Sequence, residues 1–226
     1  MKKIFFILTI FLFSCSNNKI ESLNPISKAI DNKDIFNILY YFPLFIDLSD
    51  QFGKTPIIQA IEKNDLNGVI KLVNLGADVN KADNMGNIPI IRAIILRKYE
   101  IALFLLKIKA NINIYSKDGE TPLIKAILSN NIILFEELLN YGAKVDLVDK
   151  NGNSALMRLV ILENYTDIYP FRNQMTEILM RRNPNVNLKN KKGETPLTLA
   201  KLPSKIEVLE IITKIRKYDQ KSKLWI

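Results

Sequence analysis

A glycine recurs along the chain at a fixed spacing. Gly53, Gly86, Gly119 and Gly152 stand 33 residues apart, and Gly193 follows after a further 41. Other residues keep the same register: Pro56, Pro89, Pro122 and Pro196; Ala60, Ala93, Ala126 and Ala200; and the pairs Val79-Asn80, Ile112-Asn113, Val145-Asp146 and Val186-Asn187. Such a period is typical of small supersecondary units stacked in one array.

Each period carries two helical patterns. In residues 50–82 the first helix is expected to open at Thr55 and Pro56, because threonine can accept a hydrogen bond from a free first-turn N–H and proline has no N–H. Apolar residues follow at the i, i+3, i+4 spacing of a buried stripe. A second helix is expected over 66–75, ended by Gly76, where glycine most easily adopts a left-handed backbone.

This order of turn, Thr-Pro helix, second helix and Gly-Ala-x-Val-Asn resembles the ankyrin repeat over roughly residues 50–215. The matching residues are Asp50, Gly53, Thr55, Pro56, Ile57, Ala60 and Gly76 to Asn80, and Gly119, Thr121, Pro122, Leu123, Ala126, Leu138, Leu139, Gly142, Ala143 and Val145. The resemblance implies an all-α solenoid of stacked helix-turn-helix units with extended hairpin loops, capped at both ends. It also implies a non-catalytic module that binds a protein through a concave face of turns and first helices.

We therefore predict a signal peptide at 1–14, a lipidated tether at 15–24, a capping helix pair at 25–49, repeats at 50–82, 83–115, 116–148 and 149–189, and a fifth repeat with a C-terminal cap at 190–226. The fourth repeat is longer by eight residues, which we assign to an insertion near 164–171. Its aromatic residues are Tyr165, Tyr169 and Phe171. They either contact a partner or pack back on the stack.

The chain departs from the family pattern at several positions. The usual histidine after Thr-Pro-Leu is replaced by Ile58, Ile91, Ile124, Met157 and Thr198. We expect apolar burial there to compensate for the lost hydrogen bond. Ile88 replaces a capping threonine, at an expected cost of about 1 kcal/mol, whereas Ser154 can still cap. Lys109 stands where Gly76 and Gly142 stand, so we expect the helix before it to end less cleanly.

The N-terminus has the features of an export signal. Lys2 and Lys3 precede an apolar run at 4–13, which is too short to span a bilayer about 30 Å thick. The next residues complete the sequence Leu-Phe-Ser-Cys, which resembles a bacterial lipobox ending at Cys15; Phe13 is bulkier than usual. We expect lipidation of Cys15 and a membrane-anchored protein of the bacterial cell envelope, on its periplasmic or surface face. The alternative is ordinary signal cleavage and a soluble secreted protein.

The composition argues against catalysis. The chain has no histidine and one cysteine, so it lacks the usual general base, the commonest metal ligand and a thiol that lipidation would leave free. We therefore predict no enzyme activity, no metal and no cofactor. The carboxylates that recur near the turns are interpreted as turn formers that bond their own backbone. They are Asp50, Asp83, Asp118 and Asp149.

Variable residues at the turn tips are the candidates for partner binding. They are Lys81, Asn84, Met85, Asn87, Tyr115, Lys117, Glu120, Val148, Lys150, Asn151, Asn153, Lys189, Lys191, Lys192 and Glu194. The preferred ones are Met85, Tyr115 and Lys117, followed by Lys150, Asn151 and Lys191. The net charge of +9 favours an acidic protein partner, and no nucleic-acid motif accompanies it. Two alternatives are a regulatory subunit of an envelope enzyme and a structural protein lying on anionic membrane.

Overall fold

The computed structural model describes residues 46–162, 171–201 and 209–214. The chain divides into two compact units, the first ending at Gly86 and the second beginning at Asn87. In the described residues the backbone forms helices and turns, apart from one isolated antiparallel bridge. The fold is therefore the helical repeat array that the period predicts.

Several predicted features lie outside the described residues. These are the signal segment, the tether with Cys15, nearly all of the N-terminal cap, and Tyr165 and Tyr169 of the insertion. In the predicted C-terminal cap the described residues 209–214 are helical, and Ile212 is buried.

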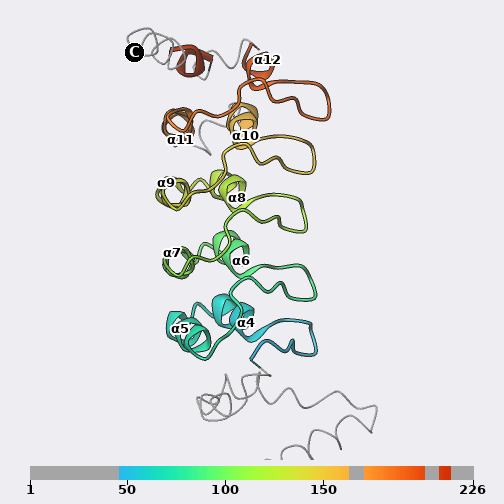
Figure 1. The fold of residues 1–226 in the computed structure, drawn as a ribbon, viewed down its shortest axis with the longest axis vertical. Coiled ribbons are helices and arrows are strands. Elements are labelled where there is room, and N and C mark those ends of the chain that lie inside the picture. The colour runs from blue at the N-terminus through green and yellow to red at the C-terminus, as the bar shows by residue number, and fades with distance from the viewer. Residues whose placement is uncertain (1–45, 163–170, 202–208, 215–226) are drawn as a thin grey trace, which may run out of the picture. The chain divides into compact units, whose positions relative to one another are not determined.

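The described residues of the first unit form one helix pair. Helix α4 (Pro56–Glu62) packs against α5 (Leu66–Asn74), which lies within one residue of the expected second helix (Figure 1). The apolar stripe of α4 is fully buried, and Val69 and Leu72 of α5 complete the interior. Burial of each isoleucine, valine or leucine side chain stabilises the unit by about 1.5 to 3 kcal/mol.

The second unit repeats this pair. Its helices are α6 (Pro89–Ile95), α7 (Tyr99–Lys107), α8 (Pro122–Leu128), α9 (Ile132–Asn140), α10 (Ala155–Ile161), α11 (Arg172–Met180) and α12 (Pro196–Ala200). The first helices α6, α8, α10 and α12 pack in one row, and the second helices α7, α9 and α11 pack in another (Figure 1). The loops before α8, α10 and α12 project on the side of the first helices, away from the second helices (Figure 1). The fourth repeat's second helix begins at Arg172, directly after the predicted insertion.

The positions that replace the family's histidine behave mostly as predicted. Four of the five are buried, at 2% exposure or less: Ile58, Ile91, Ile124 and Met157. Thr198 is exposed instead, and it forms a capping box with Thr195, in which each side chain accepts from the backbone N–H of the other. Apolar packing thus replaces the missing imidazole in the first four repeats, and a local cap replaces it in the fifth.

The predicted helix caps form only in part. Thr121 Oγ1 accepts from Ile124 N at 3.2 Å, and Ser154 Oγ accepts from Met157 N at 3.4 Å. As expected, Ile88 supplies no cap. The prediction that Thr55 caps α4 is wrong, because its hydroxyl is buried and makes no hydrogen bond to the first turn or to any other described group. The first helices of the first two repeats therefore start without a side-chain cap.

The prediction that α7 ends less cleanly is also wrong. Helix α7 has nine residues, as α5 and α9 have. Lys109 adopts the left-handed backbone itself, with φ 61°, and its N–H donates to Leu106 O at 2.9 Å. The missing glycine leaves the helix length unchanged and places a side chain in a backbone conformation that costs about 1–2 kcal/mol.

Candidate functional site

The loop tips of the second unit share one local structure. We define them as residues 116–119, 149–152 and 190–193. In the second tip, Asp149 Oδ1 accepts from Asn151 N at 2.8 Å and from Asn153 N at 2.9 Å. In the third, Asn190 Oδ1 accepts from Lys192 N at 3.0 Å and from Glu194 N at 2.9 Å. A short polar side chain thus closes each tip on its own backbone.

The predicted turn formers are confirmed with one exception. Asp50 and Asp83 of the first unit accept backbone hydrogen bonds as Asp149 does. Asp118 does not, because the turn-forming position of its repeat is two residues earlier, at Ser116, whose hydroxyl accepts from Glu120 N at 3.2 Å. The Asp118 side chain is 66% exposed, and its nearest cation is Lys125 Nζ at 3.7 Å.

Neighbouring tips are in direct contact. Lys191 N donates to Asn151 O at 3.0 Å, which joins the second tip to the third. Gly119 has φ +74°, and a Cβ added to it would lie 2.9 Å from Lys150 Cβ; Gly152 has φ +79°, and its Cβ would lie 2.9 Å from Lys191 N. These glycines are required both by their backbone conformation and by the close approach of the next loop. The register between successive tips is therefore fixed.

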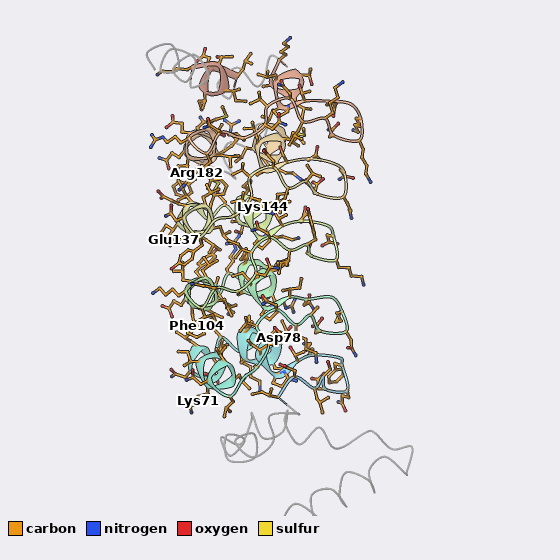
Figure 2. The ribbon with its side chains drawn as sticks, in the orientation of Figure 1. Lys71, Asp78, Phe104, Glu137, Lys144 and Arg182 are labelled. Carbon is orange, nitrogen blue, oxygen red and sulfur yellow. The ribbon has the colours of Figure 1, made fainter. Side chains whose placement is uncertain are left out.

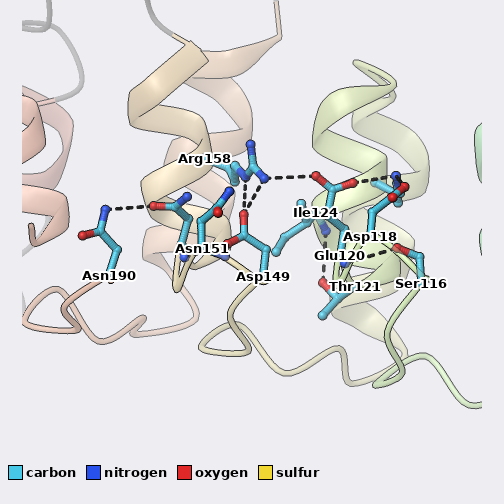
Figure 3. A network of polar contacts seen from close by, with 11 residues as sticks. Ser116, Asp118, Glu120, Thr121, Ile124, Asp149, Asn151, Arg158 and Asn190 are labelled. Carbon is cyan, nitrogen blue, oxygen red and sulfur yellow. Dashed lines mark hydrogen bonds and ion pairs between the residues drawn. The ribbon is translucent and has the colours of Figure 1, made fainter. Parts of the chain in front are cut away.

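A polar network crosses the base of the loops between the third and fourth repeats (Figure 3). Glu120 Oε2 pairs with Lys125 Nζ, and its Oε1 accepts from Arg158 Nη2 at 3.0 Å. Arg158 Nε donates in turn to Asp149 Oδ2 at 2.6 Å. The side chains of Glu120 and Asp149 are only 12% and 0% exposed. Both carboxylates are thus occupied inside the chain.

A second network lies between the fourth and fifth repeats. Asn190 Nδ2 donates to Asn153 Oδ1 at 3.0 Å and to Glu194 Oε2 at 2.9 Å. With Glu120, these residues account for three of the sequence candidates for partner binding. We remove Glu120, Asn153 and Glu194 from the candidate surface, because their polar atoms bond other repeats or their own loop.

Asn87 and Val148 are half-buried, and the remaining tip candidates are exposed. In the second unit these are Tyr115, which is 46% exposed, and Lys117, Lys150, Asn151, Lys189, Lys191 and Lys192. Met85 belongs to the first unit, where it and Phe52 occupy equivalent tip positions and are 57% and 68% exposed. Sequence reasoning missed Phe52; its equivalence to Met85 in the 33-residue register could have revealed it.

Phe171 lies apart from the tips. It is the N-cap residue of α11. Together with the α6–α7 loop and the α8–α9 loop, it lines an open hollow of about 530 Å³. Tyr99 and Ile133 are also in its lining, and Ile133 is 69% exposed. The structure therefore does not bring Phe171 together with Tyr115 or the tip lysines.

In two of the four recurring pairs, Ile112-Asn113 and Val145-Asp146, the Asn or Asp side chain has a role that the sequence predictions did not include. Asn113 Oδ1 accepts from Lys144 N, and Asp146 Oδ1 accepts from Asn185 N, each at 2.8 Å and each in the next repeat. In the first unit Asp47 does the same for Asp78 N at 3.1 Å, and burial raises the pKa of its carboxyl. These side chains connect successive loops, and their recurrence in the register was the available signal.

The described residues contain no group of three carboxylate or sulfur side chains placed to hold a metal ion. Over the same residues, no helix combines the length and the apolar character needed to cross a membrane. Phe104 of α7, Glu137 of α9 and Arg182, which follows the end of α11, lie on the side away from the tips (Figure 2).

Comparison with known proteins identifies the repeat. A family model described as ankyrin repeats in three copies matches residues 26–116 and 108–171. The chain belongs to the ankyrin repeat family. Members of this family are typically protein-interaction modules and are generally non-enzymatic. A search of curated protein sequences finds no match to this ankyrin chain.

Solved ankyrin structures share the fold. The ankyrin repeat domain ABAYE2397 from Acinetobacter baumannii AYE is 26% identical, with a TM-score of 0.72 over 85% of this chain and 97% of that domain. The ankyrin repeat protein EF0377 is 23% identical, with a TM-score of 0.71 over 85% and 98% of the two chains. The ankyrin repeat domain of Bcl-3, a member of the IkappaB family, is 23% identical, with a TM-score of 0.66 over 79% and 75%.

Proposed function

We propose that this ankyrin protein binds a protein partner of acidic character through the loop tips of its second unit, with Tyr115 beside them. The proposal rests on which charged side chains face solvent at the tips and which face inward. Lysines stand exposed at every tip, and none of them has a carboxylate partner among the described residues. The carboxylates Glu120, Asp149 and Glu194 face inward and bond other side chains.

This arrangement favours an acidic surface over a neutral one. An exposed patch of one sign accelerates encounter with the opposite sign and disfavours partners of like charge. Tyr115 adds a large side chain that is rigid and half exposed, a type enriched at interaction hot spots. Met85 and Phe52 supply apolar contact area on the first unit, and we keep Met85 as a separate candidate contact.

We further propose that the protein is a lipid-anchored component of the bacterial cell envelope. The proposal rests on the lipobox-like residues ending at Cys15 and on the basic, then apolar, residues before them. Metabolic labelling with a tagged fatty acid should mark the full chain and should not mark Cys15→Ser. Labelling that survives this substitution, or a mature chain that begins elsewhere than Cys15, would contradict the anchor and favour ordinary signal cleavage.

The binding proposal is tested by crosslinking the full chain to its partner in native envelopes. The double variant Tyr115→Ala, Lys117→Gln should capture the principal partner less efficiently. The matched control is Phe104→Ala, Lys107→Gln, which likewise removes one aromatic ring and one lysine charge, here from α7 on the second-helix side (Figure 2). Equal loss in both variants, or no loss in the tip variant, would move the binding surface elsewhere. Capture of anionic lipid alone would favour the membrane-lying alternative.

A further inference from the structure

Three lysines occupy one equivalent position in the second unit. Lys117, Lys150 and Lys191 each follow directly after the residue that closes its tip. The glycine two residues further on has φ +74°, +79° and +78° in the three tips, so the loops have the same backbone turn. All three lysines are exposed. We call them the lysine ladder.

The spacing of the ladder is set by the packing of the repeats. Helices α8, α10 and α12, which follow the three tips, pack on one another in order. Packed helix axes lie about 8–10 Å apart. The contact of Gly119 with Lys150 and the hydrogen bond from Lys191 N to Asn151 O hold successive tips at the same step. The ladder therefore presents positive charges at intervals of about 8–10 Å.

The charge of the ladder is opposed by one exposed carboxylate at the tips. Asp149 is buried against Arg158, and the third tip carries no acidic residue. Asp118, beside Lys117, is the exception: its 3.7 Å approach to Lys125 is weak because Glu120 already pairs with that lysine. An acidic partner would meet attraction at three places and repulsion at one.

We propose that the lysine ladder binds an extended acidic segment of a partner protein, with one carboxylate at every third residue. This inference rests on the proposed function and specifies the partner's chemistry. A chain in the polyproline II conformation has three residues per turn and rises about 3.1 Å per residue. Acidic residues at i, i+3 and i+6 then lie on one face, about 9.3 Å apart, which matches the ladder.

Other backbone conformations match less well. In a β-strand, side chains on one face are two residues apart, at about 6.8 Å, or four apart, at about 13.6 Å. An α-helix reaches about 10.5 Å on one face only with acids seven residues apart. The spacing of acidic residues in the partner thus distinguishes the modes of binding.

The test measures binding of synthetic peptides to the full chain by fluorescence anisotropy. Each peptide has the same length and composition, with three glutamates among proline, alanine and glutamine. The glutamates stand at every third residue, at every second residue, at every seventh residue, or side by side. We expect the every-third peptide to bind most tightly, with an affinity that falls as salt rises. Equal affinity for all spacings, or tightest binding of another spacing, would overturn the proposal.

Substitutions locate the peptide on the protein. Each of Lys117→Gln, Lys150→Gln and Lys191→Gln should lower the affinity for the every-third peptide by about two- to fivefold, and the triple variant by at least tenfold. A control triple with the same charge change elsewhere, Lys107→Gln, Lys144→Gln, Arg181→Gln, should lower it by less than twofold. An equal loss in both triples would show attraction to net charge and overturn the ladder. Circular dichroism and thermal melts confirm that the variants fold.

Asp118→Asn provides a gain-of-binding arm. Removing the exposed carboxylate should raise the affinity about twofold, and an unchanged or lower affinity would contradict the charge argument. Tighter binding to anionic vesicles or to single-stranded nucleic acid than to the every-third peptide would also overturn the proposal. If the crosslinked partner still depends on Tyr115 but lacks such an acidic segment, this inference fails while the proposed function stands. If the partner ignores the tips altogether, the proposed function fails as well.

Discussion

Asp149 and Arg158 form an ion pair at the base of the loop of the fourth repeat, where Arg158 Nε donates to Asp149 Oδ2 at 2.6 Å. The other carboxylate oxygen, Oδ1, accepts from two backbone N–H groups of the same loop. The same guanidinium reaches Glu120, which lies 38 residues earlier. One residue pair thus ties a loop to its own helix and to the preceding repeat. The shape of the candidate binding face depends on these contacts.

Asp149→Ala should destabilise the protein by about 2–3 kcal/mol, because two backbone N–H groups and part of the Arg158 guanidinium lose their acceptor in a buried place. The control Asp118→Ala removes an exposed carboxylate with one weak pair and should change stability by less than about 0.5 kcal/mol. Urea unfolding of both variants measures the difference. Equal effects would mean that the buried network contributes nothing beyond surface charge.

Substitutions at Gly152 and Gly193 distinguish two reasons for glycine at a tip: the positive φ and the close approach of the next loop. Both have positive φ, +79° and +78°, but a Cβ on Gly152 would lie 2.9 Å from Lys191 N, and a Cβ on Gly193 would meet nothing within 4 Å. Gly193→Ala should cost about 1 kcal/mol for the backbone alone. Gly152→Ala should cost at least about 1 kcal/mol more, because the next loop must move. Similar melting temperatures for the two variants would show that the loops do not press on one another.

Most of the fold could be predicted from the sequence, because the determining residues act locally. In the first and third repeats, a proline at the first turn and a glycine after the second helix specify where the helix pair begins and ends. Helix α5 falls within one residue of its expected span for this reason. The family resemblance supplied the stacking of the pairs, which no local signal contains.

The candidate site was harder to predict. The sequence shows which residues differ between repeats, but it does not show which way their side chains point. Glu120 looks like a variable tip residue until the structure brings Arg158 beside it. The turn at 116–119 was mispredicted for a similar reason. Either Ser116 or Asp118 could have accepted the backbone hydrogen bond that closes it, and the structure shows that Ser116 does. The lysines were easier to place, since a long charged side chain at a loop tip has no buried alternative.

Lys109→Gly should stabilise the protein by about 0.5–1 kcal/mol. Glycine removes the strain of a left-handed lysine, and part of the gain is offset by greater freedom of the unfolded chain. Gly76 and Gly142, at the equivalent positions of other repeats, have φ of 96° and 88°. The comparison variant Lys107→Gly, at the last residue of α7, should instead lose up to about 1 kcal/mol. Thermal denaturation distinguishes these opposite signs; a destabilised Lys109→Gly would refute the strain argument.

Asp47→Asn should make stability less dependent on pH. Burial is the largest influence on the Asp47 carboxyl and raises its pKa above the ordinary value of 3.8, so between the two pKa values the folded state holds more of this proton than the unfolded state does. The contribution of Asp47 to the stability of the natural protein therefore falls as pH rises from about 3.8 through the folded pKa, and the loss is complete above it. Asparagine keeps an oxygen for Asp78 N, as Asn113 does for Lys144 N, and has no charge to bury.

The Asn variant should accordingly be more stable than the natural protein at pH 7, and its advantage should shrink toward pH 3. Asp47→Ala serves as the control, because it removes the charge and the acceptor together. It leaves Asp78 N–H without its partner and should cost about 1 kcal/mol relative to Asp47→Asn at every pH. Urea unfolding of all three proteins between pH 3 and pH 7 gives both differences. An advantage of the Asn variant that grows as pH falls would reverse the sign of the linkage and contradict the raised pKa.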